Sequence, residues 1–302
     1  MKPTLLILAA GMGSRYGGLK QVDAIGSNGE AIIEYSIYDA IRAGFGKVVF
    51  VIREDIETAF REKFGGKFDD QIEVDYAYQA MDSPIEGLDL DRLPHREKPW
   101  GTAHAVLVAA DKVQEPFAVI NADDYYGIDS FEKMSKFLQE DCAADHWSMV
   151  GYVLGKTLSD NGTVNRGVAA MDDQYGLTEL NERLKIRQDD SGISYLGTDD
   201  KRYPLQATDL VSMNFFGFHP SVFEHMREQF LEFVEANRDA PRAEFFIPLV
   251  VNRLVQSGEV KMTVLPTEAQ WYGVTYQEDK AIVQEAFADL THSGKYPDKL
   301  WS

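Results

Sequence analysis

The chain begins with an apolar run, residues 4–9, that breaks at once into a glycine-rich stretch, residues 11–20. The run has the length and composition of a strand buried in a parallel sheet. Four glycines surround Arg15 in the stretch that follows, and Lys20 closes it. Glycines let a ligand approach the backbone N–H groups, and two cations complement negative charge. The opening of the chain therefore predicts a phosphate-binding loop at the end of a first strand.

Strands and helices alternate through the first half of the chain. Apolar runs predict strands over residues 4–9, 47–52 and 117–120, and a further strand is expected over 73–78. Helical spacing predicts helices over 32–43, 56–64, 102–110 and 130–140. This alternation indicates a parallel sheet with helices on both faces. Ligands of such sheets bind at the carboxyl ends of the strands, so we expect the glycine loop and residues 121–124 to share one rim.

The pattern changes near residue 148. Strands are expected over 149–154, 167–171, 175–186 (a strand or hairpin edge), 210–218 and 261–266, and helices over 222–236, 244–256 and 278–289. Residues 82–99 hold prolines and alternating Asp and Leu, which predicts an excursion loop or a lid. We expect one α/β domain, residues 1–302, whose later strands extend or cover the sheet over the site.

The acidic composition narrows the range of partners. The 302 residues carry a formal net charge of -19, with a pI near 4.7. Nucleic acids and anionic membranes are polyanions that need basic patches, so neither is expected as a partner. A small anionic ligand is still allowed, because a local cationic loop can bind it. The single cysteine, Cys142, excludes an intrachain disulfide and fits a reducing cytoplasm. No apolar run approaches the roughly 18–20 residues that span a bilayer.

Two familiar phosphate-binding loops do not fit the spacing of the glycines. A dinucleotide-binding loop reads G-x-G-x-x-G, whereas Gly17 follows Gly13 one position too late. A P-loop ends in Gly-Lys-Ser or Gly-Lys-Thr, whereas residues 18–20 read Gly-Leu-Lys. Neither of these two loops therefore explains the spacing of the glycines.

Residues 8–15, Leu-Ala-Ala-Gly-x-Gly-x-Arg, with Lys20 shortly after, resemble the signature loop of the sugar-1-phosphate nucleotidylyltransferases, which make nucleotide-sugars. The resemblance implies a Rossmann-like three-layer α/β/α fold with a mixed, mostly parallel sheet. It implies a nucleotide-binding half, about 1–147, and a sugar-phosphate-binding half, about 148–302. In the family this loop wraps the triphosphate, and the arginine and lysine stabilise charge on the leaving pyrophosphate. The expected nucleotide contacts are Ala9, Ala10, Gly11 and Gly13, with Arg15 and Lys20 as catalytic residues.

The resemblance extends to residues that would bind the base. Gln79 stands where the family reads a pyrimidine edge, and Gly101 where the base packs flat on the backbone, with Thr102 beside it. An alternative is that these residues simply start a helix with Thr102 as its N-cap. A glutamine favours a pyrimidine nucleotide (UTP, dTTP or CTP), because its amide can meet both a ring N–H and a carbonyl.

Residues 121–124, Asn-Ala-Asp-Asp, follow a buried strand and suggest a Mg²⁺ site. Mg²⁺ takes one or two carboxylates together with substrate phosphates. The resemblance assigns the metal to Asp123, whereas Asp124 is expected in a turn or a helix cap, with a metal contact as the less favoured role. The family has a second metal aspartate just after a tryptophan, but here Gly273 or Val274 stands where that carboxylate is expected after Trp271. Either Asp123 works with waters and phosphates, or another acid such as Asp279 reaches in, or the chain is a divergent member.

Residues in the second half of the chain resemble those that bind the sugar-phosphate in the family. Gly167 resembles the family glycine whose backbone meets the sugar, and Glu182 the glutamate that binds sugar hydroxyls. The next residue, Arg183, would hold the acceptor phosphate as a bidentate donor, with Lys185 as the alternative. Asn214 is expected to face the sugar pocket. Glu244 is expected to begin a helix, with a sugar contact as the less favoured role, and Phe245 and Phe246 are expected in the core of that helix.

These matches predict nucleotidyl transfer from an NTP to a sugar-1-phosphate with Mg²⁺. The attacking phosphate is already ionised, so positioning and charge neutralisation replace a general base. Two alternatives stay open, a cytidylyltransferase that acts on a phosphorylated alcohol such as phosphocholine, and a binding relative without turnover. A cytoplasmic location is expected, and the sequence leaves the oligomeric state open, including a homo-oligomer.

Overall fold

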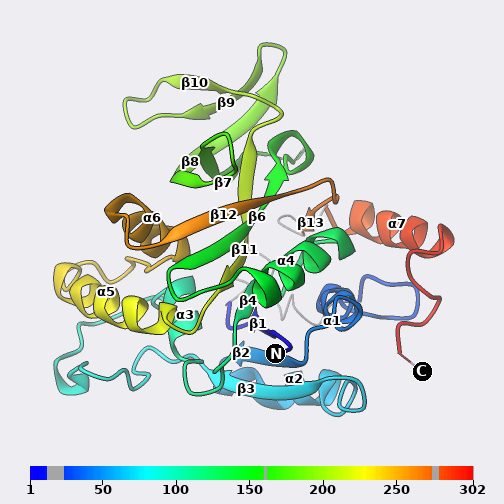
Figure 1. Cartoon of the computed structure of the whole chain (residues 1–302), viewed down its shortest axis with the longest axis horizontal. Coiled ribbons are helices and arrows are strands. Elements are labelled where there is room, and N and C mark those ends of the chain that lie inside the picture. Colours follow the sequence, from blue (N-terminus) through cyan, green and yellow to red (C-terminus); the bar gives the residue numbers. More distant parts are fainter. Residues whose placement is uncertain (12–23, 160–161, 274–278, 302) are drawn as a thin grey trace.

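Four parallel strands form one end of the main sheet, in the lower part of the view in Figure 1. The computed structural model describes residues 1–11, 24–159, 162–273 and 279–301. The four strands are β1 (Thr4–Leu8), β2 (Lys47–Ile52), β3 (Glu73–Tyr78) and β4 (Phe117–Asn121). They lie in the order β4-β1-β2-β3, and Leu6 stands opposite Val49 of β2 and Val119 of β4. The predicted parallel core is confirmed.

Helices cover both faces of this core, as Figure 1 shows. Leu5 and Ile7 of β1 belong to the core beneath α1 (Ile32–Arg42), α2 (Glu57–Phe64) and α4 (Ile128–Glu140). Leu6 points to the opposite core, beneath α3 (Thr102–Leu107), α5 (Val222–Ala236) and α6 (Ile247–Ser257). A strand with both faces buried needs an unbroken apolar run, which is why residues 4–8 show no polar alternation. The three-layer α/β/α architecture is confirmed.

The sheet continues into the second half of the chain, where antiparallel pairs make it mixed. Over the described residues it has eleven strands, in the order β10-β9-β8-β7-β11-β4-β1-β2-β3, with β6 paired to β11 and β12. The added strands are β6 (His146–Val153), β7 (Val164–Met171), β8 (Leu177–Asp189), β9 (Gly192–Leu196), β10 (Arg202–Leu205), β11 (Leu210–Phe218) and β12 (Lys261–Thr267). The remaining elements are a separate pair, β5 (Asp124–Tyr125) with β13 (Tyr272–Gly273), the helix α7 (Asp279–His292), and the 3-10 helices η2 (Glu54–Ile56), η3 (Leu90–Arg92) and η4 (Leu154–Lys156).

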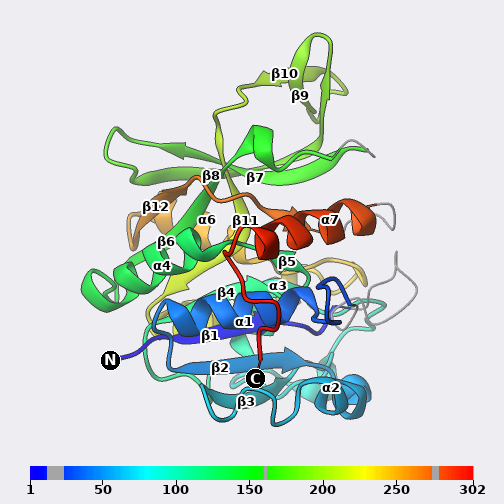
Figure 2. The ribbon, with the colours of Figure 1, turned by 90° about the vertical axis from the view of Figure 1, so that its right-hand side faces the viewer.

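The hairpin of β9 and β10 was not predicted. It projects from the rest of the fold (Figure 2), and β10 is an edge strand of the sheet. Tyr203 in β10 is 40% exposed, and its neighbour Pro204 suits an edge strand because proline lacks an N–H to donate. Ile193 of β9 is buried and alternates with polar Ser194, but strands of five and four residues give too short a pattern to predict.

The helix expected from residue 244 begins at Ile247 instead. The Phe245 N–H donates to Trp100 O at 2.5 Å, and Phe245 O accepts from Ala103 N–H at 3.0 Å. These bonds hold the residues before α6 in an extended conformation. The expectation that Glu244 begins the helix is therefore wrong. Phe245 is buried but lies outside the helix, and Phe246 is 40% exposed rather than a core residue.

The segment 82–99 is an excursion loop that is anchored to the chain between α5 and α6. The buried Arg96 side chain donates from Nη1 to Ala240 O at 3.1 Å, and its guanidinium lies 4.0 Å from the centre of the Trp100 ring. The Glu97 N–H donates to Pro241 O at 3.0 Å. These contacts tie the loop to the segment between α5 and α6, which favours the excursion over the lid.

The carboxyl-terminal residues 293–301 pack along α1 through buried polar contacts. The Tyr296 hydroxyl donates to the Asp39 carboxylate at 2.6 Å, and Trp301 Nε1 donates to Glu34 at 2.9 Å. Tyr296 also lies 2.9 Å from the Tyr125 hydroxyl in β5. Asp39 has no exposed surface, and burial raises the pKa of its carboxyl from 3.8 to about 7, against the opposing effects of Tyr296 and Arg42. The end of the chain therefore covers a buried acid next to the strand that begins with Asp124.

Asp39→Asn is expected to become increasingly stabilising, relative to the parent, as pH rises. The folded state keeps the Asp39 proton up to about pH 7, whereas the unfolded chain releases it near 3.8, so the parent loses stability between these values. The asparagine has no charge to bury and can still accept from Tyr296. The stability difference should grow by up to about 4 kcal/mol over this window and stay constant above pH 8. Urea unfolding between pH 4 and 8 measures it, with the exposed Asp69→Asn as control. A difference that does not change with pH would contradict the prediction.

Candidate active site

The predicted phosphate loop starts on the same rim as the acidic loop after β4. Ala122 N–H donates to Leu8 O at 3.1 Å, which joins the ends of β4 and β1. Ala9 N–H donates to Val51 O at 2.8 Å, and Arg53 Nη1 donates to Ala10 O at 2.9 Å. The start of the loop therefore lies on the expected rim, with Gly11 exposed on it. Gly13, Arg15 and Lys20 lie outside the described residues, and their roles stay predictions.

A buried polar network surrounds the acidic loop. Asp124 Oδ2 accepts hydrogen bonds from Asn121 Nδ2 at 2.9 Å and from the Tyr126 hydroxyl at 3.3 Å. Asn121 Oδ1 accepts from Asn214 Nδ2 at 2.9 Å. Asn214 lies in β11 where the strand bulges, with a left-handed backbone (φ 67°). Such a conformation is uncommon outside glycine and often marks a functional position. The bulge brings the second half of the chain against the acidic loop of the first.

Gly273 lies directly against Asp124. The two residues are partners in the pairing of β13 with β5. A Cβ built on Gly273 would lie 2.3 Å from the Trp271 ring and 2.9 Å from Asp124 Oδ1. There is no room for a side chain at this position, because the Asp124 carboxylate and the indole already fill the space. The Asp124 carboxylate therefore lies where a side chain at residue 273 would point.

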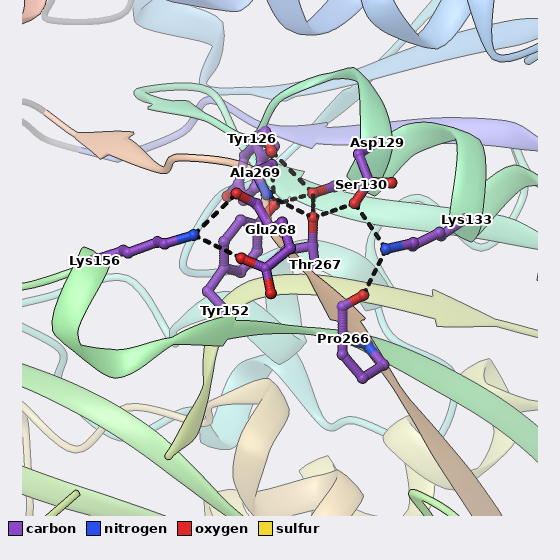
Figure 3. Close-up of polar contacts among 10 residues, drawn as sticks. All are labelled: Tyr126, Asp129, Ser130, Lys133, Tyr152, Lys156, Pro266, Thr267, Glu268 and Ala269. Carbon is purple, nitrogen blue, oxygen red and sulfur yellow. Dashed lines mark hydrogen bonds and ion pairs between the residues drawn. The ribbon is translucent and has the colours of Figure 1, made fainter. Parts of the chain in front are cut away.

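Polar contacts fix the end of β12 to the start of α4, as Figure 3 shows. The Asp129 carboxylate accepts from Thr267 Oγ1 at 2.6 Å and from Lys133 Nζ at 2.8 Å. The same ammonium donates to Pro266 O at 2.8 Å. This arrangement sets the direction in which the chain leaves β12. It therefore positions residues 271–273 against the acidic loop.

The residues predicted to bind the base meet each other. Gln79 follows β3, and its Nε2 donates to Gly101 O at 3.1 Å. Gly101 is the N-cap of α3, so the alternative of Thr102 as N-cap is wrong. Thr102 Oγ1 instead accepts the Ile247 N–H at 3.2 Å, which joins α3 to α6. The predicted pair of Gln79 and Gly101 is therefore one hydrogen-bonded unit.

The residues predicted to bind the sugar-phosphate lie on β7 and β8. Gly167 is buried and stands opposite Glu182 in the antiparallel ladder. Partial desolvation raises the pKa of the Glu182 carboxyl, and the charge of Arg166 opposes this shift. The guanidinium of Arg183 lies over the Tyr195 ring, 4.5 Å from its centre. Lys185 is exposed and left-handed (φ 50°), and its N–H donates to Asn165 Oδ1 at 2.9 Å.

A sequence model described as nucleotidyl transferase matches residues 4–275, nearly the whole chain. The chain belongs to the nucleotidyl transferase family. This result confirms the resemblance inferred from the motifs, and with it a nucleotidyltransferase as the class of enzyme. No curated protein matches the chain in sequence.

Solved structures share the fold of this nucleotidyl transferase. One, from Bacillus anthracis, is described as a glucose-1-phosphate thymidylyltransferase in complex with sucrose (14% identity, 95% of each chain covered, TM-score 0.64). A UDP-glucose pyrophosphorylase complexed with UDP-glucose has 15% identity over 96% of this chain and 99% of its own, with TM-score 0.61. The inositol-1-phosphate CTP transferase from T. maritima has 13% identity over 96% of each chain, with TM-score 0.65. At these identities the similarity establishes the fold.

The nucleotidyl transferase has a further cation at the site, Arg166, that the sequence analysis did not single out. Its guanidinium lies 5.1 Å from the centre of the Trp271 ring and donates to Thr157 O at 2.5 Å. Burial lowers its pKa to about 10, while Asp124 and Glu182 favour the charged form. The side chain is therefore charged at neutral pH. Its position in the sequence, directly before the glycine predicted to meet the sugar, was the available signal.

The donor set at the rim of the nucleotidyl transferase fits Mg²⁺. Asp123 lies in the turn between β4 and β5, directly before Asp124. Among the described side chains, no three of His, Cys, Asp or Glu gather as a metal-binding group. Two carboxylates that leave the other positions to phosphates and water suit Mg²⁺. The side chain of the other candidate, Asp279, lies outside the described residues. Among the helices that the structure describes, none is long and apolar enough to span a bilayer.

Proposed function

We propose that this nucleotidyl transferase transfers NMP from an NTP to a sugar-1-phosphate, releasing pyrophosphate and forming an NDP-sugar. The observation that supports this best is the contact between the two halves at the rim. Asn214 of the second half donates to Asn121 in the acidic loop, beside the end of β1. A nucleotide on residues 1–147 and a sugar-phosphate on 148–302 would meet at this contact.

The residues of the chain then act by position and charge. Ala9, Ala10, Gly11 and Gly13 bind the triphosphate through the backbone, and Arg15 and Lys20 stabilise the charge that builds on pyrophosphate. Asp123 and Asp124 hold Mg²⁺. When bound, Mg²⁺ supplies charge neutralisation between the phosphates. Each of these groups orients a reactant or offsets its charge, so the reaction needs no protein base.

The acceptor is bound by the second half of the chain. Gly167 meets the sugar through its backbone, and Glu182 accepts from the sugar hydroxyls. The acceptor phosphate is held by Arg183, with Lys185 as the alternative, and Asn214 faces the sugar. The positive charge of Arg166 lies near Glu182 and Asp124. It therefore also reduces the electrostatic repulsion between these two carboxylates and the acceptor phosphate.

A second acceptor class has specific support. The fold is shared with an inositol-1-phosphate CTP transferase as well as with proteins named for sugar phosphates. Cytidylyl transfer to a phosphorylated alcohol would use the same phosphate loop and metal residues. The decisive assay is pyrophosphate release with Mg²⁺ over a panel of NTPs, each paired with sugar-1-phosphates, inositol-1-phosphate and phosphocholine. Release with a sugar-1-phosphate supports the proposal, release only with an alcohol phosphate supports the second class, and binding without release supports a non-catalytic relative.

Lys20→Ala is expected to abolish turnover while the protein stays folded. The substitution removes a cation assigned to the leaving pyrophosphate, so kcat should fall at least about 10²-fold. Pyrophosphate release measures this loss, and thermal unfolding checks the fold. Lys136→Ala, at an exposed position of α4, is the control and should keep full activity. Near-normal activity of Lys20→Ala would refute the assignment of the first loop.

A further inference from the structure

The side-chain amide of Gln79 has its two donor hydrogens committed inside the protein. Nε2 lies 3.1 Å from Gly101 O and 3.2 Å from His104 Nδ1. A carbonyl oxygen only accepts, so the nitrogen of the amide, and not its oxygen, must face Gly101. With one hydrogen on Gly101 and the other on His104, the amide has only Oε1 left for a ligand. No group in the described residues donates to that oxygen.

His104 is suited to hold this orientation at every working pH. It is the third residue of α3, is 1% exposed and lies 4.8 Å from the Phe230 ring, centre to centre. Burial, with the nearby charge of Arg96, lowers the pKa of its imidazole to about 3, so the ring is neutral. Because Nδ1 accepts from Gln79, the ring proton sits on Nε2, a buried atom without a hydrogen-bond partner in the described residues. Such an unpaired buried donor costs free energy, which a purely structural residue would avoid.

We propose that His104 is a positioning residue that fixes Gln79 as a hydrogen-bond acceptor, so that the site selects uracil or thymine nucleotides over cytosine nucleotides. This rests on the proposed function, in which Gln79 faces the edge of the base. Uracil and thymine carry an N–H at N3, which can donate to Gln79 Oε1, whereas N3 of cytosine is itself an acceptor. The expectation that the glutamine amide meets both a ring N–H and a carbonyl is replaced, because its own N–H groups are occupied.

Three nucleotides test the hydrogen bond in the parent protein. UTP should bind at least about 10-fold more tightly than CTP or N3-methyl-UTP, which both lack the N3 hydrogen. Calorimetry measures the dissociation constants without need of turnover. CTP lacks the N3 hydrogen without carrying an extra group at N3. N3-methyl-UTP lacks the same hydrogen but keeps both carbonyls of uracil.

Variants of His104 test its role. His104→Ala frees the Gln79 amide to turn, so the preference for UTP over CTP should fall to about 2-fold or less, with a raised KM and kcat within about 2-fold of the parent. His104→Asn should restore the preference, because Asn Oδ1 lies near the position of Nδ1 and accepts the same hydrogen bond. Val106→Ala, a buried position of the same helix, removes packing without touching Gln79 and should keep the preference.

The outcomes separate this inference from the proposed function. Equal binding of UTP and CTP by the parent, a preference for CTP, or an unchanged preference in His104→Ala would each overturn the inference, even if pyrophosphate is released. N3-dependent binding that His104→Ala abolishes and His104→Asn restores would support it, even if no acceptor yields pyrophosphate. That result would contradict the proposed function but leave the inference on base selection standing.

Discussion

Asp123→Asn is expected to lower kcat by about 10³-fold with little change in the stability of the fold. The substitution keeps the size of the side chain and removes one negative charge assigned to Mg²⁺. Metal binding supplies several kcal/mol of transition-state stabilisation in such sites, and about 1.4 kcal/mol corresponds to a factor of ten in rate. Pyrophosphate release at saturating Mg²⁺ measures the loss. The rise in melting temperature on adding Mg²⁺ with a non-hydrolysable NTP measures metal binding without turnover, and it should disappear in the variant.

Two further variants show whether the effect belongs to the proposed site. Asp124→Asn should also reduce the response to Mg²⁺, because Asp124 Oδ1 fills the place against Gly273 where a carboxylate was expected. Asp111→Asn changes an exposed carboxylate beside Lys112 and should keep both activity and metal response. If Asp123→Asn keeps full activity and its response to Mg²⁺, the metal assignment at this loop fails.

The strands of the parallel core could be predicted almost to the residue. β2 and β3 begin and end where they were predicted, at Lys47–Ile52 and Glu73–Tyr78. β2 is buried along almost its whole length, so its residues must be apolar whatever they pack against, whereas β3 is a partly buried edge strand in which apolar and acidic residues alternate at the start. The start of α6 was misplaced by three residues because it depends on the backbone bonds of Phe245 to Trp100 and Ala103, more than 140 positions earlier in the chain. Contacts of this kind leave no periodic trace.

The same contrast holds in the candidate site. Gln79 and Gly101 could be paired from the motif, and the structure joins them by a hydrogen bond. The sequence shows that residue 273 has no carboxylate. The cause is visible only in the fold, where Gly273 in the two-residue strand β13 pairs with Asp124 in β5. Arg166 and His104 were overlooked because each acts through neighbours that only the fold supplies. Sequence patterns thus located the rim, and tertiary contacts decided which side chains face it.

Gly101→Ala is expected to destabilise the protein by about 3–5 kcal/mol and to weaken nucleotide binding. The backbone of Gly101 has φ 104°, a conformation that strains an alanine by about 1–3 kcal/mol. A Cβ would also lie 2.7 Å from Phe245 O and 2.9 Å from Phe245 N, which are held by their own hydrogen bonds. Neither group can retreat without breaking the link between α3 and the segment before α6. Because Gly101 O orients Gln79, the same shift should disturb the base site. Urea unfolding and nucleotide calorimetry measure the two effects.

Gly29→Ala separates the conformational strain from the steric clash. Gly29 has a similar backbone, φ 88°, but no atom lies within 4 Å of the position its Cβ would take. An alanine there should cost only about 1 kcal/mol, because it pays for the left-handed backbone and displaces nothing. The difference between the two variants therefore reports the contact of Gly101 with Phe245. Equal losses of stability would show that strain alone requires the glycine. A loss at Gly101 several times larger, accompanied by weaker nucleotide binding, would show that close backbone packing sets the direction of the carbonyl that holds Gln79.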